Sequence, residues 1–252
     1  MTLWPAPGAA PPWLLRYGHW LFKYRNKVFP FVLLGLFAAF RPGLLGGSYT
    51  AERALDVFGL LVALAGQILR GAVIGFAYIK RGGLNKRVYA DTLVTEGFFA
   101  HARNPLYVGN LLILLGLFLI HHDPWTYLLG GAFFILAYVA IVAAEEDFLQ
   151  RQFGDEYRAY CRRANRWVPD FCGLSQTLRD MRFNWRRVLL KDYASSYLWM
   201  MTAAGLLLFE DFQHPGLWPR GLLLACIVLT TAVFLGIYGL KKGRILRECL
   251  VS

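Results

Sequence analysis

Residues 103–146 read RNPLYVGNLLILLGLFLIHHDPWTYLLGGAFFILAYVAIVAAEE. Two apolar runs are joined by the turn sequence HHDP, with the polar motif RNPLYVG before the first run and the diglutamate EE after the second. Crossing a bilayer takes about 20 mostly apolar residues, so these runs predict a helical hairpin in the membrane. Because a hairpin returns to the surface that it left, we expect the two polar motifs to meet at one membrane face.

The composition of the whole chain fits the same environment. Apolar residues make up 57% of the 252 residues, and the mean hydropathy is positive. These values are typical of a polytopic membrane protein and argue against a soluble enzyme. We therefore predict an all-α fold, a polytopic transmembrane bundle of about six helices. The expected spans are 28–40 (extended back to residue 20), 54–79, 106–120, 125–144, 197–209 and 217–240.

The basic residues predict the orientation, because cytoplasmic loops of membrane proteins carry an excess of Lys and Arg. Threading the spans alternately places the basic segments 16–27, 80–103, 151–191 and 241–247 on one side and only Arg41, Arg53 and Arg220 on the other. Both termini and both polar motifs are therefore expected to be cytoplasmic. The net charge of +11 is also found in nucleic-acid-binding proteins. Here the cations flank apolar spans, so we expect contacts with membrane lipid headgroups and no nucleic acid.

The motif at 103–109 has the features of a helix start that binds an anion. Asn104 is a good N-cap, and Pro105 suits the first helical position because it has no amide hydrogen to leave unsatisfied. Such a start presents free N–H groups and a positive dipole end to a carboxylate or phosphate. Gly109 would let a ligand approach closely, and Arg103 adds a cation. The alternatives are a helix start without a ligand and an arginine that contacts lipid.

The second motif, Glu145-Glu146-Asp147, follows the apolar run directly. A solvated helix end would explain one acid, whereas several acids opposite a capped helix start favour pairing with Arg or hydrogen bonding to a polar ligand. An amphipathic helix at the membrane interface is predicted to follow and to end near 166–169. Its apolar positions are Leu149, Phe153, Tyr157 and Tyr160.

Together, DTLVTEGFFAHARNPLYVGN (91–110) and EEDFLQRQFGDEYRAYCRRANRWVP (145–169) resemble the core of the isoprenylcysteine carboxyl methyltransferases and their bacterial relatives. The same group includes phospholipid N-methyltransferases. The resemblance covers about residues 54–169. It implies an N-terminal segment with the first transmembrane helix (1–53), a methyltransferase core (54–170), and a basic connector with two additional helices (171–252).

The resemblance implies a methyltransferase that binds S-adenosyl-L-methionine in a cytosolic pocket closed by the interfacial helix. The implied setting is the cytoplasmic membrane of a bacterium, and the implied acceptor is a lipid or a lipophilic small molecule. If the acceptor is an amine, Glu146 is the nearest candidate base. The residues expected to bind the cofactor are Asp91, Thr92, Leu93, Val94, Phe99, Arg103, Asn104, Pro105, Tyr107, Val108, Gly109, Glu145, Glu146 and Arg166.

The chain departs from the animal enzymes of this group at two places. Asn104 stands where those enzymes have a histidine, so a role for an ionisable ring is lost although the amide still forms hydrogen bonds. The substrate-side arginine, expected about one turn before the diglutamate, falls among the apolar residues 139–142. We therefore do not predict prenylcysteine as the acceptor, and phosphatidylethanolamine-like headgroups, isoprenoid acids, quinols and small thiols all stay open.

Two other functions remain open at this level, namely an NADPH-dependent membrane reductase of the sterol-reductase type and a noncatalytic protein with the same fold. Gln67 and Arg70, inside the second span, either line a site or link helices. We predict no metal site, because the four cysteines lack paired spacing and His121-His122 reads as a turn. No signal peptide is evident, and a homo-oligomer is compatible with the sequence.

Overall fold

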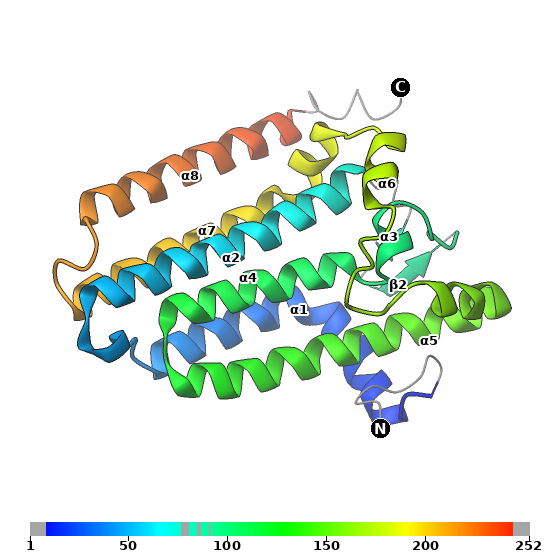
Figure 1. Ribbon diagram of the computed structural model, residues 1–252, viewed down its shortest axis with the longest axis horizontal. Helices are drawn as coiled ribbons and strands as arrows, with labels where there is room; N and C mark the ends of the chain where they lie inside the picture. Colours follow the sequence, from blue (N-terminus) through cyan, green and yellow to red (C-terminus); the bar gives the residue numbers. More distant parts are fainter. Residues whose placement is uncertain (1–8, 77–80, 85–86, 91, 244–252) are drawn as a thin grey trace. The chain divides into compact units, whose positions relative to one another are not determined.

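The computed structural model describes residues 9–76, 81–84, 87–90 and 92–243 (Figure 1). Each predicted span coincides with a helix, and the all-α membrane bundle is confirmed. Asp91 and the last residues of the second predicted span, 77–79, lie outside the described residues. Within the described ranges the long helices are α1 (Pro12–Ala39), α2 (Tyr49–Phe76), α4 (Pro105–His121), α5 (Gly131–Arg163), α7 (Trp185–Gln213) and α8 (Arg220–Lys242).

Short elements complete the described chain. They are η1 (Leu45–Gly47), α3 (Phe98–His101), the π-helical turn η2 (Thr126–Gly130) that leads into α5, and α6 (Leu174–Asp180). The basic loop also contains a two-stranded antiparallel hairpin that the sequence did not predict. Its strands are β1 (Arg81–Leu84) and β2 (Arg87–Ala90), with Arg81 opposite Ala90 and Leu84 opposite Arg87.

Three of the described helical segments are long and apolar enough to cross a membrane: α2, η2 with α5, and α8. Helix α4 is apolar but shorter, at 17 residues. Helices α1 and α7 are longer than predicted because they continue into charged sequence at their N-terminal ends.

The helices belong to two compact units. The first unit consists of Met1–Ala39, Phe76–Val108 and Tyr127–Met181, and the second of Phe40–Gly75, Gly109–Thr126 and Arg182–Ser252. The first turn of α4 thus belongs to the first unit and the rest of that helix to the second. Each unit combines separate stretches of sequence, and the division of the chain at residues 53 and 170 stays a prediction.

In the first unit, α1 lies along α5 (Figure 1). Gly18 permits this close contact, because a Cβ atom there would lie 2.0 Å from the carbonyl oxygen of Ala140. Around it, Leu14, Leu21 and Phe22 of α1 pack on Ala137 and Ile141, which share one face of α5. This contact fixes α1 against the part of α5 that precedes the diglutamate.

The second half of α5 is the amphipathic helix that the sequence predicts. Gly154 has a φ of 50° and interrupts the helix there, after which the chain continues helically to Arg163. Leu149, Tyr157 and Tyr160 are buried and form a cluster with Ala164, against which Leu93 packs. The apolar face of this helix therefore packs on protein side chains of the first unit.

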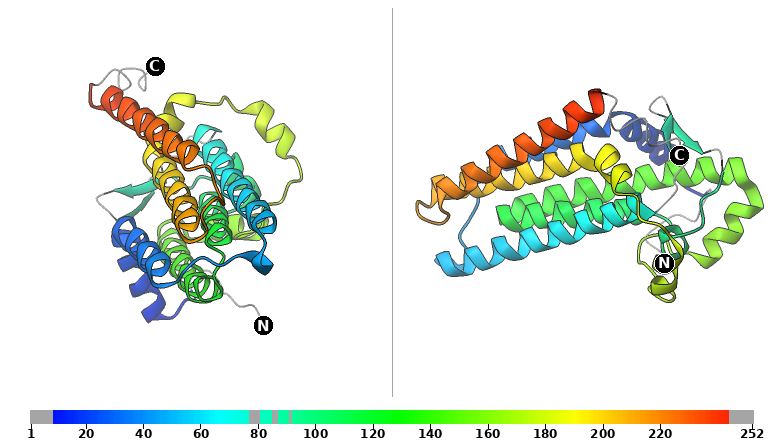
Figure 2. Two further views of the ribbon diagram at one scale, coloured as in Figure 1. Left: turned by 90° about the vertical axis from the view of Figure 1, so that its left-hand side faces the viewer. Right: turned by 90° about the horizontal axis from the view of Figure 1, so that it is seen from above.

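In the second unit, α7 and α8 lie side by side (Figure 2). The ring of Phe234 on α8 stacks on Tyr193 and Tyr197 of α7, with centroids 5.5 and 4.2 Å apart. Helices α2 and α4 meet at glycines: a Cβ atom on Gly116 would lie 2.4 Å from the carbonyl oxygen of Gly59, and one on Gly66 would lie 2.5 Å from that of Gly109. Small residues of this kind allow close packing of helices in a membrane.

Candidate active site

The segment before α4 is bound along its length to the segment after α5. The amide of Arg103 donates to the carbonyl of Asn165 at 2.8 Å, and the amide of Asp170 donates to the carbonyl of His101 at 2.9 Å. The imidazole of His101 adds contacts from Nδ1 to the carbonyl oxygen of Asp170 (2.6 Å) and from Nε2 to Thr177 Oγ1 (2.9 Å). These bonds hold the first motif beside the closing segment RWVP.

Glu146 is the electrostatic centre of this region, and its side chain is only 4% exposed. Arg166 donates to both carboxylate oxygens, from Nε to Oε1 at 3.0 Å and from the terminal nitrogen to Oε2 at 2.6 Å. Arg103 lies 3.3 Å from Oε1. Burial disfavours the charged form of Arg103, but the carboxylate of Glu146 and the thiol of Cys161 outweigh that effect, so the pKa of Arg103 is raised. Of the two alternatives that the sequence left open for the acids, pairing with arginine is observed for Glu146.

Asn104 occupies the N-cap position of α4, as predicted. Its carbonyl accepts from the amides of Tyr107 and Val108 at 3.1 and 3.2 Å. Its side-chain amide donates to the carbonyl of Arg166 at 3.1 Å, and the residue is 5% exposed. The amide thus ties the helix start to the closing segment, a role that needs a hydrogen-bond donor and no ionisable ring.

Glu145 takes part in a second contact, which reaches α1. The hydroxyl of Tyr107 donates to Glu145 Oε1 at 2.6 Å and accepts from Arg25 at 2.9 Å. The guanidinium of Arg25 lies 4.5 Å from the centroid of the Phe22 ring, and the ring of Tyr107 packs against Tyr138. Glu145 is half-buried, whereas Glu146 is buried, so Glu145 is the more accessible of the two acids. Together with the contacts of Glu146, this bond confirms the predicted meeting of the two polar motifs.

The remaining predicted residues have different surroundings. Thr92 is exposed, Leu93, Val94 and Val108 are half-buried, and Pro105 is buried at the start of α4. Phe99 is buried, and its carbonyl accepts from the Tyr160 hydroxyl at 2.7 Å. Gly109 belongs to the second unit, where it faces α2: a Cβ atom there would lie 2.7 Å from Cγ of Arg70. Because Gly109 has no side chain, α4 can pack closely against α2 at this position.

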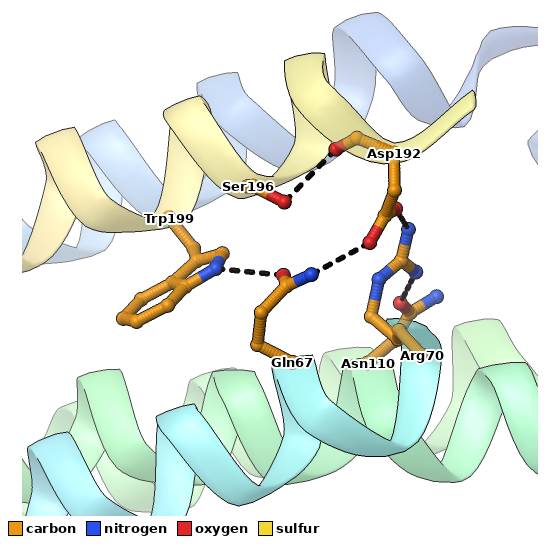
Figure 3. A network of polar contacts seen from close by, with 6 residues as sticks. All are labelled: Gln67, Arg70, Asn110, Asp192, Ser196 and Trp199. Carbon is orange, nitrogen blue, oxygen red and sulfur yellow. Dashed lines mark hydrogen bonds and ion pairs between the residues drawn. The ribbon is translucent and has the colours of Figure 1, made fainter. Parts of the chain in front are cut away.

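Gln67 and Arg70, the polar residues inside the second predicted span, link helices of the second unit (Figure 3). Arg70 donates to Asn110 of α4 and pairs with Asp192 of α7. Gln67 donates to the other oxygen of Asp192 at 2.7 Å and accepts from the indole of Trp199 at 2.9 Å. Of the two roles that the sequence left open, these contacts favour helix linkage.

With the site assembled, comparison with known proteins gives the family. Residues 56–156 match the phospholipid methyltransferase family, a range that contains both polar motifs. Over this range the match confirms the family resemblance that the sequence predicts. The reaction class of that family is methyl transfer, and the described part of this chain has three helical segments long and apolar enough to cross a membrane.

Among curated proteins, the chain is 37% identical to the cobalt-zinc-cadmium resistance protein CzcN of Cupriavidus metallidurans over 79 residues, which are 31% of this chain and 36% of that protein. It is 41% identical over 66 residues to an uncharacterised protein of Haemophilus influenzae, which are 25% of this chain and the whole of that protein. The chain thus spans little more than a third of the first relative. No solved structure matches it.

Proposed function

We propose that this protein transfers a methyl group from S-adenosyl-L-methionine to a lipid or lipophilic acceptor at the cytosolic face of a bacterial cytoplasmic membrane. The observation that carries the proposal is the convergence of Arg103 and Arg166 on the buried carboxylate of Glu146, with Asn104 bonded to the backbone carbonyl of Arg166. This convergence builds a charged centre at the start of α4. Arg103 and Glu146 lie within the range that matches the methyltransferase family, and Arg166 follows it.

The two glutamates have different roles in this proposal. Glu146 is buried and has both oxygens bonded to Arg166, so it positions Arg103 and the closing segment. We assign the cofactor contact to Glu145, because it is half-buried and therefore the more accessible acid, with Tyr107 as a neighbour. Carboxylates are suitable acceptors for ribose hydroxyls and an amino group, and the N–H groups at the start of α4 suit the carboxylate of the cofactor's amino acid.

Methyl transfer from a sulfonium requires mainly alignment of donor and acceptor. A carboxylate acceptor needs no base, whereas an ammonium headgroup must first lose a proton. The guanidinium groups of Arg103 and Arg166 contact the carboxylate of Glu146, and this favours a positioning role for Glu146. If the acceptor is an amine, the accessible Glu145 is then the better candidate base.

The test is transfer of radiolabelled methyl from S-adenosylmethionine to a total lipid extract by the purified protein in detergent. Glu145→Gln is the test variant, and Asp147→Asn is the matched control, because Asp147 forms an ordinary helix-surface pair with the exposed Arg151. Label in one lipid class, lost in Glu145→Gln and kept in Asp147→Asn, supports the proposal and identifies the acceptor class. Equal labelling by both variants removes Glu145 from the site.

Cofactor binding distinguishes the alternatives. Titration with S-adenosylhomocysteine should show saturable binding, whereas a reductase would bind NADPH. Binding of S-adenosylhomocysteine without lipid labelling would redirect the search to small lipophilic acceptors. Absence of such binding would overturn the methyltransferase proposal, and it would leave the noncatalytic alternative if NADPH also fails to bind.

A further inference from the structure

The second unit contains three buried carboxylates that the proposed methyl transfer does not use. Glu52 and Asp56 lie one turn apart near the start of α2, and Glu210 lies in the last turn of α7. One oxygen from each of the three side chains lies within 4.8 Å of the other two. All three residues are 0% exposed.

Most oxygens of this carboxylate cluster (Glu52, Asp56 and Glu210) lack a donor. Within the part of the chain that the structure describes, Glu52 Oε1, Asp56 Oδ1 and both oxygens of Glu210 are buried without a hydrogen-bond partner. The other two oxygens are held by protein donors: the amide of Leu45 donates to Glu52 Oε2, and the indole of Trp218 donates to Asp56 Oδ2 at 2.7 Å. Glu210 is therefore fully buried, and its side-chain contact is with the carboxyl group of Asp56 in the same cluster, so the two acids must share a proton or a cation.

The nearby arginines are bonded elsewhere. Arg53 donates to the carbonyls of Gly216 and Leu217, and Arg220 pairs with Asp211. Among the described residues, no ion pair reaches any of the three carboxylates of the cluster. A buried carboxylate without a counter-charge is strongly unfavourable, so the cluster needs either protons or a bound cation.

We propose that Glu52, Asp56 and Glu210 bind a hard divalent cation such as Ca²⁺ or Mn²⁺. An all-oxygen, carboxylate-rich donor set selects this class of ion over metals that prefer sulfur or imidazole. Ca²⁺–oxygen bonds of about 2.3–2.6 Å allow one ion to contact three oxygens that lie within 4.8 Å of one another. The bound cation would join the start of α2 to the end of α7.

The cluster lies near the surface-exposed connections at one end of α2 and α7. Glu52 lies in the first turn of α2, after the exposed residues 45–48, and Glu210 lies in the last turn of α7, before the partly exposed loop at 214–219. The cluster therefore lies at the helix ends that these two loops adjoin. Because Glu210 is distant in sequence from Glu52 and Asp56, no local sequence motif predicts this site.

The test uses the purified full chain in detergent, stripped with EDTA and then titrated with Ca²⁺ and with Mn²⁺. Binding is measured by calorimetry for Ca²⁺ and by loss of the free-ion electron paramagnetic resonance signal for Mn²⁺. Glu210→Gln, which keeps the shape of the side chain, is the test variant. Asp211→Asn is the matched control, since Asp211 is equally buried but bonded to Gly216, Trp218 and Arg220.

We expect saturable binding of about one cation per chain, lost in Glu210→Gln and retained in Asp211→Asn. A second readout, the thermal unfolding midpoint, covers the case in which the variant folds poorly: Ca²⁺ should raise the midpoint of the native chain, and EDTA should lower it. No saturable binding of either ion, or a midpoint of the native chain that responds to neither addition, would overturn the proposal and leave a protonated cluster.

Discussion

Arg166 holds Glu146 through a two-point contact, with both carboxylate oxygens accepting from one guanidinium. The two residues are 20 positions apart, and the second half of α5 runs between them. Two parallel hydrogen bonds fix the plane of the guanidinium as well as its distance, so this contact orients the closing segment. The same residue accepts from Asn104 through its carbonyl, which connects the start of α4 to the same anchor.

The first prediction is that Arg166→Lys lowers the affinity for S-adenosylhomocysteine by about tenfold, since loss of one charge-assisted hydrogen bond costs about 1.5 kcal/mol. Lysine keeps the positive charge but has no planar fork, so the closing segment loses its orientation. Isothermal titration measures the affinity. Arg163→Lys, at an exposed position on α5, is the control and should bind normally. Equal affinities for the two variants would contradict the role of the fork.

Much of this site could be predicted from the sequence. The helix start at Asn104-Pro105 and the diglutamate are local signals, and the apolar hairpin between them dictates that they meet. The family resemblance added Arg166, which belongs to the closing segment of that family. These predictions depend on segment length and capping, which are properties of neighbouring residues.

Other parts could not be predicted, because they depend on contacts between distant segments. Arg25 is one of several cations at 16–27, and nothing local marks it as the partner of Tyr107. Its position on the helix that packs along α5 became informative only with the fold. Asp192 likewise belongs to a charged stretch before the predicted span, and only the fold shows that it pairs with Arg70.

The second prediction concerns the hydroxyl of Tyr107, which links Arg25 to Glu145. Tyr107→Phe should keep the ring contact with Tyr138 and remove both hydrogen bonds, at a cost of about 1–2 kcal/mol in the free energy of unfolding. The measurement is thermal unfolding in detergent. Tyr24→Phe, on the exposed side of α1, should change the midpoint little. A Tyr107→Phe midpoint equal to that of Tyr24→Phe would show that the link contributes nothing to stability.

The third prediction concerns the ion pair between Arg70 and Asp192 (Figure 3). Asp192→Leu leaves a nearly buried guanidinium without its counter-charge, and it should destabilise the second unit by about 3 kcal/mol or more. Replacing both partners, as Arg70→Met with Asp192→Leu, removes the unpaired charge and should recover most of that loss. The measurement is a double-mutant cycle, which compares the unfolding midpoints of the two single variants and the double variant with that of the native chain. Simple addition of the single effects would mean that the pair is not energetically coupled.

The last prediction concerns the glycine contacts between α2 and α4. Gly66 faces the backbone of α4, and a Cβ atom there would lie 2.5 Å from the carbonyl oxygen of Gly109 and 2.9 Å from the amide nitrogen of Ile113. Backbone atoms cannot move aside as a flexible side chain can, so Gly66→Ala must separate the helices and should cost about 1–3 kcal/mol. Gly205→Ala lies in the interior of α7, where an added Cβ atom would meet nothing within 4 Å, and it should instead stabilise by up to about 1 kcal/mol through helix propensity. Opposite shifts of the two unfolding midpoints would establish close packing as the reason for glycine at position 66. If both variants shifted the unfolding midpoint in the same direction, close packing of α2 on α4 would not be the reason for glycine at position 66.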